Sequence, residues 1–171
     1  VKKAQEPDGY LDTYFIIKEP EKRWQNLLEC HELYCMGHMI EAAVAHYEVT
    51  GKTNFLEVAK KAADHIDSRF GKEKTRGIPG HEEIELALLR LFQATGETKY
   101  RDLAAYFINE RGTEPNYFEV ERKRINWTHW PMDPYDRKYS QNHKPVREQN
   151  TAEGHSVRAM YLYTAMADLA G

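Results

Sequence analysis

The sequence predicts an all-α fold built from helical hairpins, and three observations support this prediction. Apolar residues recur at helical spacing through most of the chain. Glycines stand where these segments end, as they commonly do just after a helix. One hairpin pattern occurs twice at a constant offset: Tyr47-x-x-Thr50-Gly51-x-x-x-Phe55-x-x-x-Ala59 matches Phe92-x-x-Thr95-Gly96-x-x-x-Tyr100-x-x-x-Ala104. Repeated hairpins of this kind stack so that each one buries the next.

Five long helices are expected along the chain, and a glycine follows each of the first four. In order, they are Trp24–Thr50, Asn54–Phe70, His81–Thr95, Lys99–Glu110 and Ala152–Ala170. The stretch 113–150 is rich in proline, asparagine, aspartate and aromatic residues, which predicts a long ordered loop. Within this loop we expect one short strand or helix at Tyr117–Arg124.

Helical pairs can stack into an open solenoid or close into a toroid with inner and outer helices. The first helix of each pair carries small or mixed residues, as a helix packed on two sides should. The second carries charges on one face, which is typical of an outer helix. The pattern therefore favours the toroid, with Trp24–Thr50 and His81–Thr95 as inner helices.

Composition excludes several classes of protein. A chain of 171 residues with 41% hydrophobic residues can bury the core of one domain. Its net charge of −3, with acids and bases interspersed, provides no basic face for nucleic acid. No apolar run reaches the roughly 20 residues of a membrane span, and no signal-peptide pattern is present. Cys30 and Cys35 are poorly placed for an intrahelical disulfide, which predicts buried free thiols in a reducing compartment.

Three histidines mark the candidate site, because each opens a predicted helical stretch: His31, His81 and His155. Helix N-termini present free N–H groups and the positive end of the helix dipole. Several of them side by side make a polar pocket that suits an oxygen-rich ligand. We therefore expect the three histidines to converge at one mouth of the toroid and to bind substrate there.

Other residues near these histidines allow two interpretations. His38 lies two turns deeper than His31 and is predicted to be a structural histidine of the core. The acidic residues after His81 are typical of any first helical turn. Trp127 and Trp130 could either stack on a sugar ring or pin the long loop, and the sequence leaves both open.

No catalytic residue and no metal ligand is predicted in this chain. The sequence contains no serine nucleophile elbow, phosphate loop or dinucleotide-binding glycine pattern. The segment HEEIE lacks the second histidine of the HExxH zinc motif. Cys30 and His31 point about 100° apart on a helix, which is poor geometry for proton transfer between them.

The chain resembles glycoside hydrolase family 127, the β-L-arabinofuranosidases, in segments that occur in order along nearly its whole length. These are QEPDGYLDTYF, CHELYCMGHMIEAAVAHYEVTGK, ADHIDSRFG, PGHEEIELALLRLFQATGE and HKPVREQNTAEGHSVRAMYLYTAMADLAG. The resemblance implies part of an (α/α)6 barrel that releases terminal β-L-arabinofuranose from arabinosides or arabino-oligosaccharides with retention of configuration. It also implies a cysteine nucleophile, a glutamate acid/base, and a zinc ion held by a glutamate and three cysteines.

By this resemblance, His31, His81 and His155 match the family's histidines that contact the sugar hydroxyls. The catalytic glutamate and the zinc cysteines have no counterpart, since Cys30 and Cys35 do not match them, and we expect them after Gly171. Residues 1–171 are accordingly expected to be a fragment of a single catalytic domain, without a second domain and inactive by itself. The expected parent is a bacterial zinc glycosidase that binds a small carbohydrate and neither nucleic acid nor membrane. The rest of the barrel would complete its pocket.

Two other functions remain open at this point. A sugar epimerase with the same barrel could use the inner-helix histidines as acid and base without zinc. A non-enzymatic helical-repeat module would place the three histidines far apart. The preferred arabinoside, the oligomeric state, and a cytoplasmic as opposed to a periplasmic or secreted location are also open.

Overall fold

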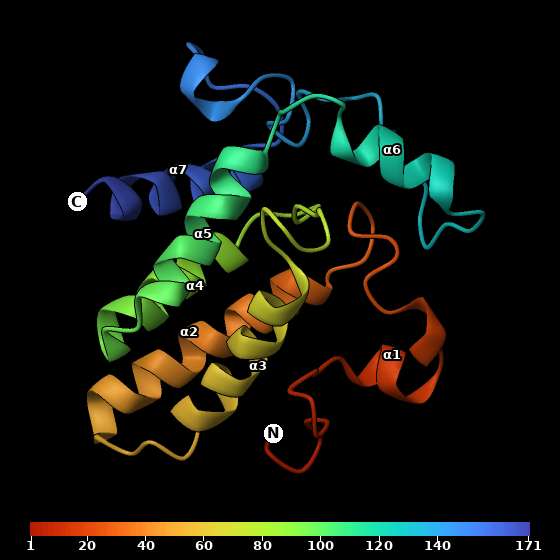
Figure 1. Cartoon of the computed structure of the whole chain (residues 1–171). Helices are drawn as coiled ribbons and strands as arrows, with labels where there is room; N and C mark the ends of the chain where they lie inside the picture. Colours follow the sequence, from red (N-terminus) through yellow and green to blue (C-terminus); the bar gives the residue numbers. More distant parts are fainter.

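The computed structural model describes residues 1–171, and it contains helices and loops but no sheet (Figure 1). Its α-helices are α1 (Thr13–Ile17), α2 (Glu32–Thr50), α3 (Leu56–Arg69), α4 (Ile84–Thr95), α5 (Thr98–Glu110), α6 (Tyr117–Arg124) and α7 (Ser156–Ala170). Two short 3-10 helices, η1 (Pro20–Lys22) and η2 (Val146–Glu148), and one isolated bridge between Phe70 and Thr75 complete the regular structure. The predicted all-α class is confirmed.

The helices form two layers. Helix α2 packs beside α4, and α7 packs against the other side of α4, which gives an inner row (Figure 1). Helix α3 lies on α2 and α5 lies on α4, and these two outer helices also contact one another. Helix α4 is buried over most of its length, whereas α3 buries a single stripe that includes Ala59, Ala62, Ala63 and Ile66. This is the inner and outer division that the sequence predicts for paired helices.

The repeated sequence pattern produces repeated backbone geometry. Gly51 and Gly96 both adopt left-handed conformations, with φ of 67° and 72°, and each donates its N–H to the carbonyl four residues earlier. Thr50 and Thr95 each donate their hydroxyl to a carbonyl one helical turn back, at 2.6 and 2.7 Å. Glycine is required at both turns because left-handed backbone is strained for other residues.

The predicted start of the first inner helix is wrong, since α2 begins at Glu32 and not at Trp24. The backbone N–H of Trp24 donates to both carboxylate oxygens of Glu32, at 3.1 and 3.0 Å. Those of Leu27 and Leu28 donate to Glu121, at 2.8 and 3.0 Å. Side-chain carboxylates thus take the place of helical carbonyl acceptors, and a segment with helical spacing folds into a compact loop.

Other boundaries differ by smaller amounts. The five-residue helix α1 is absent from the prediction, α4 begins three residues after His81, and α7 begins at Ser156 and not at Ala152. The open choice at Tyr117–Arg124 is settled as a helix. Both cysteines are free, but Cys35 is exposed because it lines an open cavity beside His31, so the prediction of two buried thiols is correct only for Cys30.

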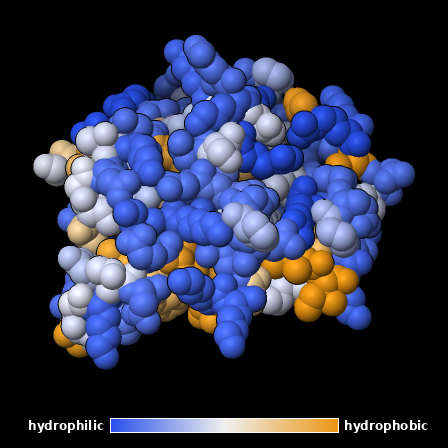
Figure 2. Space-filling view, turned by 60° about the horizontal axis from the view of Figure 1, so that its bottom comes forward, coloured by the Kyte–Doolittle hydropathy of each residue, from blue (hydrophilic) through white to orange (hydrophobic).

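The face of the molecule shown in Figure 2 is largely hydrophilic. In the view of Figure 2, hydrophobic residues gather in separate patches between charged and polar ones. None of the helices combines the length and the apolar character that crossing a bilayer requires.

Candidate functional site

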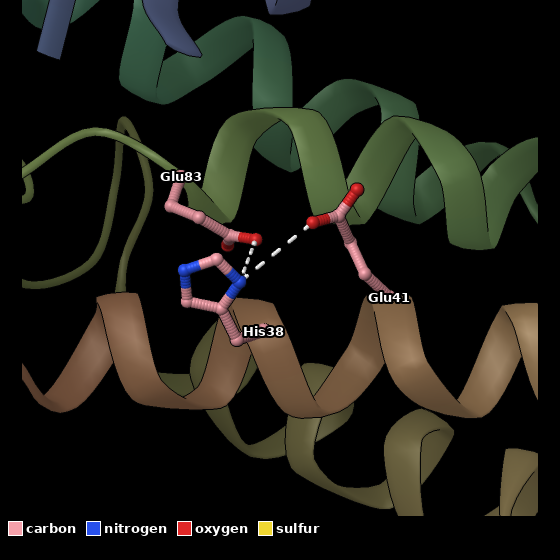
Figure 3. A group of neighbouring side chains, drawn as sticks. All are labelled: His38, Glu41 and Glu83. Carbon is pink, nitrogen blue, oxygen red and sulfur yellow. Dashed lines mark ion pairs between the residues drawn. The ribbon is translucent and has the colours of Figure 1, made fainter. Parts of the chain in front are cut away.

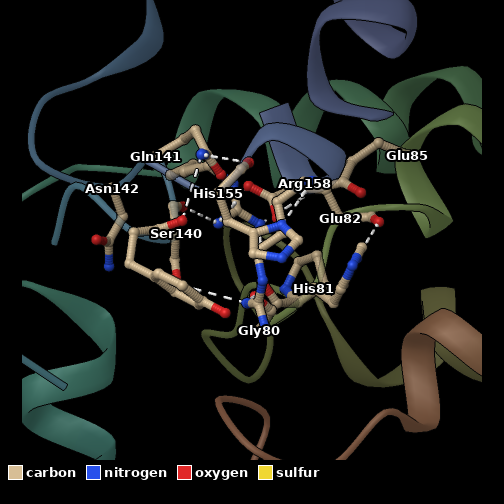
Figure 4. A network of polar contacts seen from close by, with 12 residues as sticks. Gly80, His81, Glu82, Glu85, Ser140, Gln141, Asn142, His155 and Arg158 are labelled. Carbon is tan, nitrogen blue, oxygen red and sulfur yellow. Dashed lines mark hydrogen bonds and ion pairs between the residues drawn. The ribbon is translucent and has the colours of Figure 1, made fainter. Parts of the chain in front are cut away.

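The starts of the three inner helices bring the three predicted histidines together. His31 is the N-cap residue of α2, His155 is the N-cap residue of α7, and His81 stands three residues before α4. The ring centroids of His31 and His81 lie 5.8 Å apart, and those of His81 and His155 lie 6.2 Å apart. The predicted convergence is therefore confirmed, and His81 is the middle member. Figure 4 shows His81 and His155 from close by.

Backbone contacts determine which ring nitrogen of each histidine carries the proton. Nδ1 of His31 lies 3.1 Å from the carbonyl oxygen of Glu29, and Nδ1 of His81 lies 2.8 Å from that of Glu82. A carbonyl oxygen only accepts, so both Nδ1 atoms donate and both neutral rings present Nε2 as an acceptor. His155 is the opposite case, because its Nδ1 accepts from the backbone N–H of Arg158 at 3.5 Å. Its Nε2 therefore carries the hydrogen and donates.

Burial keeps two of these rings neutral. Desolvation lowers the pKa of His81 to about 4, and the positive charge of Arg158 acts in the same direction. Desolvation lowers the pKa of His31 as well, again with a contribution from Arg158. At neutral pH the cluster of three rings thus presents two acceptors and one donor to a ligand, which is the pattern that neighbouring sugar hydroxyls can satisfy.

Aromatic rings surround the histidines. The ring of Tyr34 lies 4.6 Å from that of His81 and 5.4 Å from that of His31, edge to face in both cases. The indole of Trp130 lies 6.0 Å from His31 and is 53% exposed, so one apolar face borders the pocket. Trp127 instead pins the loop, because its Nε1–H donates to Gln25 at 3.4 Å. The two roles that the sequence left open are therefore divided between the tryptophans: Trp127 pins the loop, and Trp130 lies beside His31.

Arg111 forms the centre of a buried network beside the segment that carries His81. It is completely buried and pairs with Glu82 at 3.1 Å and with Glu85 at 3.5 Å. It also donates to the carbonyl oxygens of Ser140 and Pro79, both at 2.8 Å. One side chain thereby joins the long loop to the segment that carries His81.

Arg158 performs a similar task between α7 and the same segment. Its guanidinium donates to the carbonyl oxygen of Gly80 and lies 4.9 Å from the ring centre of Tyr139. A Cβ on Gly80 would lie 2.2 Å from the carbonyl oxygen of Leu28, so only glycine permits this approach. Arg158 thus fixes the backbone next to His81 and belongs to the same helix start as His155.

Sequence reasoning missed the buried acids at the start of α4. Glu82, Glu83 and Glu85 were expected to be ordinary first-turn residues, but all three are buried. Burial raises the pKa of Glu82 to about 8, although Arg111 opposes this shift. A signal was present in Arg158, which interrupts an apolar stretch at the start of α7, because a buried arginine needs a buried acid as its partner.

A family described as beta-L-arabinofuranosidase, GH127 catalytic domain, matches residues 1–170. The chain belongs to this family. It is 45% identical over 98% of its length to a non-reducing end beta-L-arabinofuranosidase of Bifidobacterium longum subsp. longum, and it covers 27% of that protein.

Solved structures of the family share the fold. A GH127 beta-L-arabinofuranosidase of Geobacillus stearothermophilus T6 matches with a TM-score of 0.91 and 52% identity, covering 99% of this chain and 27% of that one. The GH127 beta-arabinofuranosidase BT3674 matches with a TM-score of 0.78 and 42% identity over 99% and 25%. The chain thus spans about a quarter of the relatives that it matches, and its helices form part of the family's (α/α)6 barrel. The epimerase and the non-enzymatic module are not favoured.

The residues of this chain do not fit the zinc site that the family implies. That site needs a glutamate and three cysteines, whereas this chain has only Cys30 and Cys35. Burial raises the pKa of Cys30 to about 12, so its sulfur stays a thiol and is not the thiolate that zinc prefers.

Proposed function

We propose that this chain supplies part of the sugar pocket of a retaining β-L-arabinofuranosidase, with His31, His81 and His155 as substrate-binding residues. The observation that carries the proposal is the convergence of three imidazoles from three helix starts, with two Nε2 acceptors beside one Nε2–H donor. A furanose ring presents hydroxyls that both donate and accept, so this set can hold it in one orientation.

The low pKa of His81 supports a binding role over an acid/base role. A general acid works best when its pKa lies near the working pH, whereas His81 at about 4 is almost entirely neutral at pH 7. As a neutral acceptor, it binds a hydroxyl without exchanging a proton. The chemical step needs a nucleophile and an acid/base, and we assign neither to residues of this chain.

The exposed indole of Trp130 extends the proposal to the rim of the pocket. Its ring borders His31 and is more than half exposed. Sugar rings carry C–H faces that pack on aromatic surfaces, so Trp130 is the residue that we assign to this contact.

Several properties of the whole protein belong to the proposal as well. We propose a bacterial enzyme that holds zinc through residues other than those described here, and whose remaining barrel closes the pocket. The two free cysteines support a cytoplasmic location. The absence of a second domain stays a prediction.

The test is a histidine-to-alanine pair on one helix in the full-length enzyme. His31→Ala removes an acceptor from the pocket, whereas His46→Ala changes the same residue type about 22 Å further along α2. We expect kcat/KM on an aryl β-L-arabinofuranoside to fall about 10- to 100-fold for His31→Ala, because a buried polar partner is lost. The His46 variant should keep its activity. Equal activity of both variants would remove the histidine cluster from the site.

A further inference from the structure

A second polar cluster lies between α2 and α4, beneath the ring of Tyr34. It contains His38 and Glu41 of α2 and Glu83, the N-cap residue of α4 (Figure 3). Nδ1 of His38 lies 3.3 Å from Oε1 of Glu83 and 3.9 Å from Oε2 of Glu41. The His38 side chain is 43% exposed, so it is not the core histidine that the sequence predicts.

Glu83 is the unusual member. Its side chain is completely buried, yet neither of its carboxylate oxygens has a hydrogen-bond partner. The nearest basic group is the His38 ring, whose Nδ1 lies 3.3 Å away without forming a hydrogen bond, and no lysine or arginine pairs with Glu83. A buried carboxylate without partners is costly, so this side chain lacks a positively charged ligand.

The helix opposite is shaped to receive this carboxylate. A Cβ on Gly37 would lie 1.6 Å from Oε2 of Glu83, so the carboxylate occupies the space that any other residue would fill. Glycine in a helix interior costs about 1 kcal/mol relative to alanine. This glycine therefore serves to hold Glu83 against α2 in the direction of His38 and Glu41.

The donor set is that of a divalent transition metal. One ligand atom from each of the three side chains lies within 4.8 Å of the other two, and no other group of histidine, cysteine, aspartate and glutamate does so. Tetrahedral zinc with nitrogen and oxygen ligands holds its donor atoms about 3.3–3.5 Å apart, close to the His38–Glu83 distance. Glu41 is partly exposed and free to close the longer gap. The three imidazoles of the sugar pocket do not meet this criterion.

We propose that His38, Glu41 and Glu83 bind a divalent transition-metal ion, with Zn²⁺ as the matching probe, and so connect the two inner helices. The bound ion supplies the positive charge that compensates the buried carboxylate of Glu83. Three protein ligands leave a fourth position for water.

The test is equilibrium dialysis of this chain against ZnCl2, together with the visible absorption of added Co²⁺. We expect one saturable ion per chain, and Glu83→Gln and His38→Gln should each weaken binding at least about 10-fold. Glu41→Gln changes a partly exposed ligand, so it should also weaken Zn²⁺ binding and provides a test if the variant of buried Glu83 fails to fold. Far-ultraviolet circular dichroism checks the fold of each variant.

Matched controls identify the site. His46→Gln lies on the same helix, and Glu148→Gln removes an exposed carboxylate, so both should bind Zn²⁺ like the parent chain. No saturable binding below about 1 mM Zn²⁺ would overturn the proposal. Loss of binding in His81→Gln, with binding kept in Glu83→Gln, would overturn it equally, because the ion would then occupy the sugar pocket.

Discussion

The two ends of α2 and α4 are held by different means. At their C-terminal ends, Gly51 and Gly96 close the helices with the same left-handed turn and the same local hydrogen bonds. At their N-terminal ends a histidine recurs, but the contacts that hold the backbone do not. Buried charges from distant segments do this instead: Glu121 fastens the loop before α2, and Arg111 fastens the segment before α4. Repetition thus builds the scaffold, and individual long-range contacts build the site.

The largest expected effect comes from removing Arg111 at the site end. Arg111→Ala leaves Glu82 and Glu85 buried without their cation and frees two loop carbonyls, so the free energy of unfolding should fall by about 3–5 kcal/mol. Arg137→Ala, which breaks partly exposed ion pairs with Glu114 and Glu119, should cost less than about 1 kcal/mol. Urea unfolding followed by circular dichroism measures both. Equal losses would mean that the buried network does not hold the site.

Gly37→Ala tests the close contact between the inner helices. Alanine favours helix, but its Cβ must displace the carboxylate of Glu83, so we expect a loss of about 1–3 kcal/mol. The variant should also lose Zn²⁺ binding. Thermal unfolding and dialysis provide the two readings, and a gain in stability would show that Glu83 moves aside at no cost.

The buried acids predict how stability depends on pH. Burial raises the pKa of Glu32 and of Glu82 from near 4.5 to about 8, so the folded chain holds protons that the unfolded chain has lost. Raising the pH from 6.5 to 8 removes these protons and should lower stability by the order of 1 kcal/mol per carboxyl. His81, with its lowered pKa, acts in the opposite direction and mainly below about pH 7, where the unfolded histidine takes up a proton.

This pH dependence is measured as the melting temperature in the presence of EDTA, which keeps the chain free of metal. Glu82→Gln removes one titrating group, so its melting temperature should fall less over the same range. A melting temperature that rises from pH 6.5 to 8 would contradict the assignment of protonated buried carboxyls.

The smallest effects are expected at the repeated ends. Gly51→Ala and Gly96→Ala each force a Cβ into left-handed backbone and should each cost about 1 kcal/mol. Neither new methyl group meets another atom within 4 Å, so the two losses should be alike. A difference well above the experimental error in thermal melts would show that the two turns are not equivalent.

The contrast between local turns and long-range contacts also explains which features could be predicted from the sequence. The hairpins and their turns follow from residues close in the chain, and the meeting of His31, His81 and His155 was predicted from their places at helix starts. The loop from Trp24 to Cys30 was predicted as helix because its apolar residues have helical spacing. It is a loop because its backbone N–H groups find acceptors such as Glu121, which is more than 90 residues away in the sequence. The buried state of Glu83 depends on Gly37 across the helix pair, and no local pattern reveals it. Long-range side-chain contacts are therefore what the prediction lacked.

The open turns at Gly51 and Gly96 also make the protein convenient to modify. Both lie at the ends of their helices remote from the histidines, and nothing crowds them. A fluorophore, an affinity tag or a short peptide inserted there should leave the pocket undisturbed, since exposed tips accept such additions most readily. A dye at each tip would then report how the two hairpins move relative to each other.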